Sequence, residues 1–340
     1  MPVRARLTPA IADVRRAVRQ GFEQANILEN QLVLVACSGG ADSLALAAAA
    51  AFEGKRAGIR VGAVIVEHGI QKETVNVALA TSALLKELGL NPVEVVSVQV
   101  GSSGGLEAAA RHARYAALET AAVNHGAVVV LLGHTMEDQA ETVLLGLARG
   151  SGARSLSAMP LIRETESTSY LRPLLGIRRA TTEAFCADSG LTPWQDPHNS
   201  SVEYSRVRVR KNVIPVLEKE LGPGMVEALA RTAEQLREDA DYLDALAEEL
   251  FKRIVKVHGT WVDFSVSEIV GQPIALRNRV IKKALELFSS AISRAHVVAV
   301  TELIDNWHGQ KPLTLSGVRV DRKSDTVTLK TTKTFKPGAC

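Results

Sequence analysis

The sequence predicts an α/β protein in which a parallel sheet forms the larger domain and a smaller α+β domain follows. Residues 32–37 form a run of apolar and β-branched residues without polar alternation, which is typical of a parallel strand covered on both faces. Similar runs alternate with helical patterns as far as about residue 150, and this alternation favours a parallel sheet. A chain of 340 residues has room for about two domains.

The elements of the larger domain follow from hydrophobic spacing and from the turn residues between them. An amphipathic helix is expected over residues 9–26, because its apolar residues share one face. The strand at 32–37 stops at a glycine turn, after which alanine and leucine continue as a helix to Phe52. The other elements expected here are strands at 59–66, 93–100 and 127–132, helices at 73–88 and 106–124, and a helix opened by residues 134–142.

A change of composition marks the second domain. Gly222-Pro223-Gly224 breaks the preceding helix, so we expect domains at 1–221 and 222–332, with a short tail at 333–340. The second domain contains no recognisable catalytic cluster, and we expect it to serve in docking or recognition. Its expected elements are a long helix over 225–257, a strand at 261–266, helices at 274–288 and 294–307, and short strands within 313–329.

Composition narrows the class of protein. The 40 lysines and arginines exceed the 37 acids by three, a mild basic excess that neither requires nor excludes nucleic acid. The three cysteines, Cys37, Cys186 and Cys340, are too far apart for a Cys-x-x-Cys pair and indicate a reducing compartment. No apolar run is long enough for a membrane span, and charged residues interrupt the N-terminus. The sequence therefore predicts a cytoplasmic protein without a membrane partner.

The turn after the first strand predicts an anion site. A strand, a glycine turn and a helix in succession leave free backbone N–H groups at a positive helix start. Neither a Walker loop nor a Gly-x-Gly-x-x-Gly turn is present, and an ordinary strand-to-helix turn is the plain alternative. The six turn residues resemble the Ser-Gly-Gly-x-Asp-Ser signature of the PP-loop ATP pyrophosphatases, whose loop holds the pyrophosphate of ATP: Ser38, Gly39, Gly40, Ala41, Asp42 and Ser43.

Polar residues at the ends of other strands are expected near this loop. His68 and His134 each follow a predicted strand, and in a parallel sheet such positions share one edge, although a lone histidine is more often structural. Asp138 and Glu141 share a face of the helix that follows His134. Compensation of the helix dipole is one explanation of these acids. Their position at a strand end favours a cation site, either for Mg²⁺ with ATP or for a substrate ammonium.

Two basic clusters follow. Six arginines between residues 149 and 179 face only two glutamates, and a second cluster begins at Arg206. Either cluster alone is more often a solvated face, but two in succession beside an ATP loop favour RNA.

Five further segments carry recognisable motifs: His68-Gly69, Glu107–Tyr115, Gly133–Thr142, Arg172–Leu175 and Asp196–Arg210. Together with the loop they resemble the tRNA(Ile)-lysidine synthetases, a family of PP-loop enzymes, over roughly residues 30–218. The resemblance departs at Gln71 and Val207, where the family often has arginine and asparagine.

The resemblance implies an ATP-dependent ligase that joins lysine to C2 of the wobble cytidine of tRNA(Ile) with a CAU anticodon. The reaction would pass through an adenylated cytidine and release pyrophosphate and AMP, with ATP and Mg²⁺ as cofactors. Asp42, Asp138, Glu141 and Arg206 would be catalytic, and Asp42 would hold Mg²⁺. The loop residues would bind ATP together with His68 and His134, and the residues expected to bind tRNA are Arg111, Arg114, Arg172, Arg208 and Arg210.

Two alternatives stay open. Another PP-loop enzyme is the first, but tRNA thiolases commonly use paired cysteines, and a glutamine-dependent synthetase needs an ammonia-supplying domain for which the chain has no room. A nucleotide-binding module without catalysis is the second, and it leaves the acidic helix and the basic clusters unexplained. The sequence leaves the oligomeric state undecided, with a homodimer as one alternative.

Overall fold

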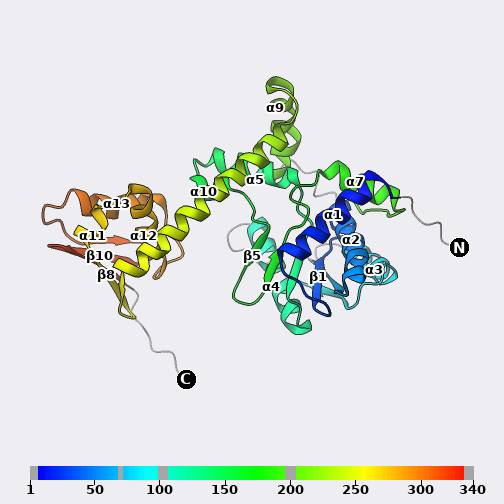
Figure 1. Cartoon of the computed structure of the whole chain (residues 1–340), viewed down its shortest axis with the longest axis horizontal. Coiled ribbons are helices and arrows are strands. Elements are labelled where there is room, and N and C mark those ends of the chain that lie inside the picture. The colour runs from blue at the N-terminus through cyan, green and yellow to red at the C-terminus, as the bar shows by residue number, and fades with distance from the viewer. Residues whose placement is uncertain (1–6, 68–71, 99–105, 196–203, 333–340) are drawn as a thin grey trace. The chain divides into compact units, whose positions relative to one another are not determined.

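The computed structural model describes residues 7–67, 72–98, 106–195 and 204–332 (Figure 1). His68 and the beginning of the Asp196–Arg210 motif lie outside the described residues. The chain divides into two compact units, Met1–Leu236 and Arg237–Cys340.

The first unit is built on a six-stranded sheet in the order β3-β2-β1-β4-β6-β5. Neighbouring strands are parallel except for the antiparallel edge pair β5 and β6. Ala36, the last residue of β1, is in register with Val64 of β2 and with Leu132, the last residue of β4. The residues that follow β1 and β4 therefore meet at one edge of the sheet. The strands are β1 (Leu32–Ala36), β2 (Arg60–Glu67), β3 (Val93–Ser97), β4 (Val129–Leu132), β5 (Ile162–Glu164) and β6 (Ser169–Leu171).

Helices cover both faces of this sheet. Val33 and Val35 of β1 share a buried core with α1, α2, α3 and α7, whereas Leu32 and Leu34 pack with α4 on the opposite face. Alternate residues of a strand point to opposite faces, so a strand covered on both sides needs a continuous apolar run. The helices are α1 (Pro9–Gln24), α2 (Ala41–Ala57), α3 (Lys72–Glu87), α4 (Leu106–His125), α5 (Met136–Ala148), α6 (Ala153–Leu156) and α7 (Arg179–Asp188).

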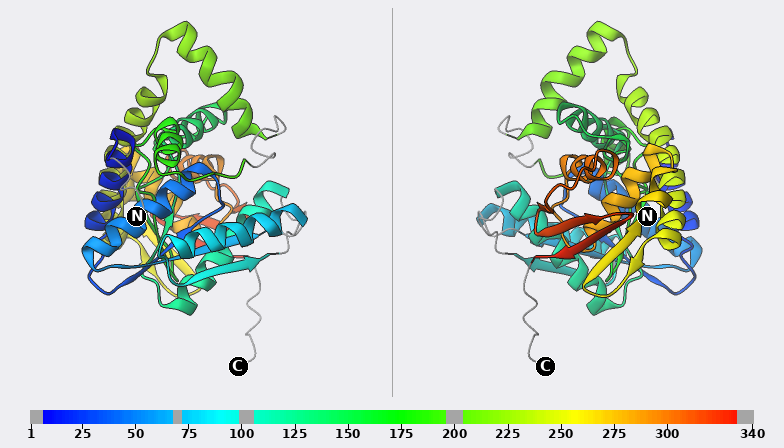
Figure 2. Two further views of the ribbon diagram at one scale, coloured as in Figure 1. Left: turned by 90° about the vertical axis from the view of Figure 1, so that its right-hand side faces the viewer. Right: turned by 90° about the vertical axis from the view of Figure 1, so that its left-hand side faces the viewer.

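The basic cluster that begins at Arg206 lies on a helical segment with three parts. An α-helical turn, α8 (Ser205–Arg208), leads into a π-helical segment, η2 (Val209–Val213), and then into α9 (Ile214–Leu221). Pro215 lies in the first turn of α9 and lacks an N–H donor, which interrupts regular helical hydrogen bonding at this point. The turn at 222–224 then joins α9 to the start of α10 (Figures 1 and 2).

The second unit is a five-stranded antiparallel sheet in the order β7-β8-β11-β10-β9, with helices packed on it. Its core joins inward residues of the strands to the helices and to the last turns of α10. The elements are the C-terminal part of α10 (Met225–Ile254), β7 (Lys256–Val257), β8 (Trp261–Ser265), α11 (Val266–Val270), α12 (Ile274–Glu286), α13 (Arg294–Asp305), β9 (Leu313–Leu315), β10 (Val318–Lys323) and β11 (Thr326–Thr331).

The predicted fold class is thus confirmed: a mostly parallel α/β sheet comes first, and a smaller α+β unit follows. The division between the units falls within α10, downstream of the Gly222-Pro223-Gly224 turn. The assignment of catalysis to residues 1–221 and of recognition to 222–332 stays a prediction. None of the helices described is both long enough and apolar enough to cross a bilayer.

Candidate active site

A cleft of about 890 Å³ lies beyond the carboxyl ends of β1 and β4. The predicted site residues that line it come from five elements or their flanking turns. They are Ser38, Gly40, Ala41, Asp42 and Ser43 before and on α2, Arg111 and Arg114 on α4, His134 and Asp138 at α5, Arg206 on α8 and Arg210 on η2.

The Ser38–Ser43 loop is held in shape by its own side chains. The Ser43 hydroxyl accepts from the Ser38 N–H at 3.2 Å and donates to the Gly40 carbonyl at 3.0 Å. Gly39 has a φ of +84°, which favours glycine, and its carbonyl accepts from the Trp194 N–H at 2.9 Å. Gly40 is the N-cap of α2 and makes no side-chain cap, so the first N–H groups of α2 are available to an anion.

Asp42, at the start of α2, is bound by two groups of α7. The Thr182 hydroxyl donates to Oδ1, and the Arg179 Nε donates to Oδ2 at 3.1 Å. Burial raises the pKa of Asp42 above its ordinary value, and the charge of Arg179 opposes that shift only in part.

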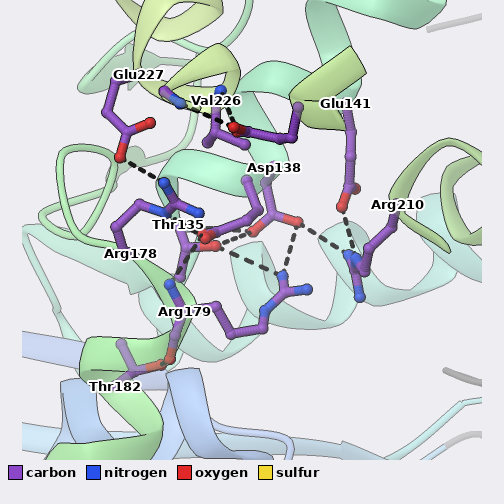
Figure 3. A network of polar contacts seen from close by, with 12 residues as sticks. Thr135, Asp138, Glu141, Arg178, Arg179, Thr182, Arg210, Val226 and Glu227 are labelled. Atoms are coloured by element: carbon purple, nitrogen blue, oxygen red, sulfur yellow. Dashed lines mark hydrogen bonds and ion pairs between the residues drawn. The ribbon is translucent and has the colours of Figure 1, made fainter. Parts of the chain in front are cut away.

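Asp138 caps its own helix and receives two arginines (Figure 3). Its Oδ2 accepts from the Thr135 N–H at 2.8 Å, which completes a capping box at the start of α5. Its Oδ1 lies 3.3 Å from Nη2 of Arg179 and 3.6 Å from Nη2 of Arg210. Burial alone would raise the pKa of Asp138, but the charge of Arg179, with His134 and the Thr135 N–H, holds this pKa below its ordinary value. Asp138 is therefore ionised at neutral pH.

Glu141 lies deeper than its partner on the same helix face. It is fully buried, and its Oε1 accepts from Nε of Arg210 at 2.6 Å. Its Oε2 has no hydrogen-bond partner among the described residues, and burial raises the pKa of Glu141. Glu141 is not among the residues that line the cleft, but it binds Arg210, which does line it.

Three other predicted residues give the cleft its electrostatic character. Burial lowers the pKa of His134 to about 3, so its imidazole is neutral, and its Nδ1 has no partner among the described residues. Arg114 and Arg206 line the cleft, and neither makes an ion pair within the part of the chain that the structure describes. Guanidinium groups remain charged near neutral pH, so both can meet an anionic ligand.

The remaining predicted arginines differ in their surroundings. Arg111 lines the cleft with its guanidinium 4.9 Å from the centre of the Tyr115 ring. Arg172 is 2% exposed and donates to the Pro160 carbonyl at 2.8 Å. It does not itself line the cleft, but it interacts with Tyr115 and His134, which do. Arg208 is exposed and also lies apart from that lining.

The donor set fits Mg²⁺ only together with the nucleotide. No group of three or more histidine, cysteine or acidic side chains suited to a metal occurs within the described residues. Mg²⁺ is usually held by one or two carboxylates plus phosphate oxygens, however, and Asp42 stands in the loop where the phosphates would lie.

Comparison with known proteins identifies the family. The PP-loop domain family matches residues 12–217, and the TilS substrate binding domain family matches residues 264–328. The tRNA(Ile)-lysidine synthase of Leifsonia xyli subsp. xyli is 54% identical over 299 residues, which cover 87% of this chain and 89% of that protein. The enzyme of the same name from Thermobifida fusca is 49% identical over 320 residues, 93% of this chain and 96% of that protein. The chain belongs to the tRNA(Ile)-lysidine synthase family.

Membership of the tRNA(Ile)-lysidine synthase family confirms the predicted resemblance, and with it the enzyme class, an ATP-dependent ligase. Among solved structures, the U34-tRNA thiolase NcsA from Methanococcus maripaludis is similar, with a TM-score of 0.58 and 19% identity. That likeness covers 67% of this chain and 79% of the thiolase, and it supports the shared PP-loop fold alone.

Proposed function

We propose that this chain ligates the ε-amine of lysine to C2 of the wobble cytidine of tRNA(Ile) with a CAU anticodon, and that both chemical steps occur in the cleft. In the first step the C2 oxygen attacks the α-phosphate of ATP and pyrophosphate leaves. In the second step the neutral ε-amine attacks C2 and AMP leaves with the former C2 oxygen. The observation that carries the proposal is that one cleft holds both the anion-binding Ser38–Ser43 loop and the ionised Asp138.

The nucleotide end of the cleft is suited to the departing pyrophosphate. Backbone N–H groups at the start of α2 offer donors to the phosphates, and Arg114 and Arg206, which make no ion pair with the described residues, offer positive charge. Asp42 would hold Mg²⁺ against the phosphates, where the ion would neutralise charge that builds up on the leaving group.

The acidic end of the cleft is suited to lysine. Asp138 is an ionised carboxylate at the cleft wall, and it can bind the ε-ammonium and hold it near C2 before a proton is lost. His134 lies beside it as a neutral imidazole, which adds no positive charge that would compete with the ammonium for Asp138. Glu141 contributes by fixing Arg210, which also contacts Asp138.

The partners follow from the same assignment. The match of residues 264–328 to the TilS substrate binding domain supports a tRNA-recognition role for the second unit. The groups assigned to catalysis belong to one chain, so the proposal does not require a homodimer.

Incorporation of labelled lysine into total tRNA, with and without ATP, tests the proposal directly. We expect incorporation to require ATP and to fall at least about 100-fold in Asp42→Ala, because the loop loses its carboxylate at the reacting phosphates. Asp13→Ala is the matched control, since this acid is half-buried on α1, outside the cleft lining, and its ion pair among the described residues is with Arg16 at 3.2 Å.

Two other outcomes would redirect the assignment. Cleavage of ATP stimulated by tRNA, without lysine transfer, would move the function to another base modification. Failure to cleave ATP with any tRNA would favour a nucleotide-binding module without catalysis.

A further inference from the structure

Arg179 is the one residue of the described cleft that joins the nucleotide loop to the acidic helix through hydrogen bonds of a single side chain. It is the first residue of α7, and its side chain lines the cleft at 20% exposure. Its Nε lies 3.1 Å from Oδ2 of Asp42. Its Nη2 lies 3.3 Å from Oδ1 of Asp138 (Figure 3). The single guanidinium of Arg179 thus pairs both with Asp42, assigned above to Mg²⁺, and with Asp138, assigned above to lysine.

The charges at the acidic end show what Arg179 does there. Asp138 and Glu141 contribute two negative charges and Arg210 one positive charge, which leaves a net charge of −1. Arg210 is fixed by Glu141 at 2.6 Å and stands farther from Asp138, at 3.6 Å. When Arg179 binds Asp138, the net charge of this group becomes zero. Arg179 also pairs with Asp42, so its charge is shared, but the Asp138 carboxylate that the ammonium of lysine would meet already has one guanidinium at 3.3 Å and another at 3.6 Å.

ATP would compete for the same guanidinium. Its phosphates carry several negative charges and would lie at the Ser38–Ser43 loop, beside the Nε of Arg179 that contacts Asp42. Arginine binds phosphate oxygens in the same two-pronged way as carboxylates. On the basis of the proposed function, we propose that Arg179 couples the binding of ATP to the binding of lysine. Its guanidinium neutralises Asp138 until the phosphates of ATP draw it away. Lysine therefore binds preferentially to the ATP-loaded enzyme.

The backbone at this position is anchored independently of the Arg179 side chain. Its own N–H donates to Oε2 of Glu137 at 2.9 Å. The neighbouring Arg178 binds Oε1 of Glu137 at 2.7 Å and also contacts Glu227 at the start of α10. Replacing the Arg179 side chain therefore leaves the start of α7 in place. Because Arg178 is itself one of these anchors, the matched control is Arg149, an exposed arginine that does not line the cleft.

The test measures lysine affinity by calorimetry on the full chain, with and without Mg²⁺ and α,β-methylene-ATP. In the wild type we expect the analogue to tighten lysine binding at least about fivefold, within the usual range of coupling between sites. Arg179→Met should bind lysine more tightly than the wild type when no nucleotide is present, and the analogue should then change its affinity less than twofold. Arg149→Met should keep the wild-type coupling.

A second variant and the ligation assay separate the ways in which the proposal can fail. Arg179→Lys keeps the positive charge but lacks the two-pronged guanidinium, so it should retain a reduced coupling. This variant provides the test if the methionine variant does not fold. Equal lysine affinity with and without the analogue in the wild type, no lysine binding to the analogue-loaded wild type, or full coupling in Arg179→Met would each overturn the proposal. If the wild type still ligates labelled lysine to tRNA in those cases, the proposed function survives and only the role of Arg179 is lost.

Discussion

The two ends of the cleft are built in different ways. At the nucleotide end, six consecutive residues, Ser38–Ser43, form the loop, and Ser43 holds its turn through hydrogen bonds within the same segment. At the acidic end, Asp138 on α5 meets Arg179 from α7 and Arg210 from η2. The first end is a local motif that a strand and a helix present to the ligand, whereas the second exists only when distant segments have folded together.

This difference sets where function is vulnerable. A local loop depends on backbone geometry, so it is most sensitive to a change of shape. An assembled group of charges depends on the balance among its members, so it is most sensitive to a change of charge. Substitutions that alter either backbone shape or side-chain charge, but not both, can therefore distinguish the contributions of the two ends.

Gly39→Ala should have the largest effect, because it strains the loop twice. Its φ of +84° disfavours any residue with a Cβ, at a cost of about 1–2 kcal/mol. An added Cβ would also lie 2.8 Å from Oγ1 of the buried Thr81. We expect kcat/KM for ATP in the lysine-incorporation assay to fall at least about 100-fold, as is typical when a reacting group is displaced by about 1 Å.

The control for this loop variant is Gly126→Ala. Gly126 also has a left-handed φ, of +64°, but a Cβ there meets no atom within 4 Å. It should lose about 1 kcal/mol of stability and keep its activity. Equal activity in the two variants would show that the loop does not depend on the close fit at Gly39.

Asp138→Asn should have a smaller and more selective effect at the other end of the cleft. The change removes one negative charge at nearly constant shape, so the lysine ammonium loses its ionic partner. We expect KM for lysine to rise about 30-fold or more, the usual cost of truncating a buried charge pair, while ATP binding is retained. Steady-state kinetics with each substrate varied in turn separate these constants.

Glu137→Gln provides the neighbouring control for that charge change. Glu137 precedes Asp138 but pairs with Arg178 and does not line the cleft. It should leave KM for lysine within about threefold of the wild type. Unchanged lysine kinetics in Asp138→Asn would remove Asp138 from the lysine site.

The contrast between the two ends also explains what could be predicted from the sequence. The signals for the loop are local: the apolar run of β1, the turn glycines and the helix start lie in one segment, and the structure has them as expected. The face shared by Asp138 and Glu141 was likewise readable from their spacing. Spacing gives the direction of a side chain but not its depth, and only the fold shows that Glu141 is fully buried against Arg210.

Arg179 and Thr182 had no signal of this kind. They lie 137 and 140 positions from Asp42, and Arg179 stood in the sequence as one member of a basic cluster. Its selection for the site depends on the packing of α7 beside α2, which buries Phe185 and Cys186 in the core around the sheet. The antiparallel β5–β6 hairpin was also missed, because each strand has only three residues and so gives little periodicity.

His134→Gln should have the smallest effect. It tests whether burial keeps this imidazole neutral. The folded chain holds the pKa of His134 at about 3, whereas the ordinary value is 6.5. Between pH 6.5 and 3 the unfolded chain therefore binds a proton at this residue that the folded chain does not bind. The free energy of unfolding of the wild type should therefore fall as the pH is lowered through this window, with a slope that corresponds to the uptake of up to about one proton on unfolding. The glutamine variant should lack this contribution.

Midpoints of thermal unfolding between pH 4.5 and 7 measure this slope. The difference between wild type and variant isolates His134 from Asp42 and Glu141, whose raised pKa values act in the opposite direction as the pH falls. The control is His112→Gln, which makes the same replacement at an exposed position on α4. If His134→Gln leaves the pH dependence of the midpoint unchanged, the imidazole is not held neutral by burial, and its assignment as a neutral group beside Asp138 would have to be withdrawn.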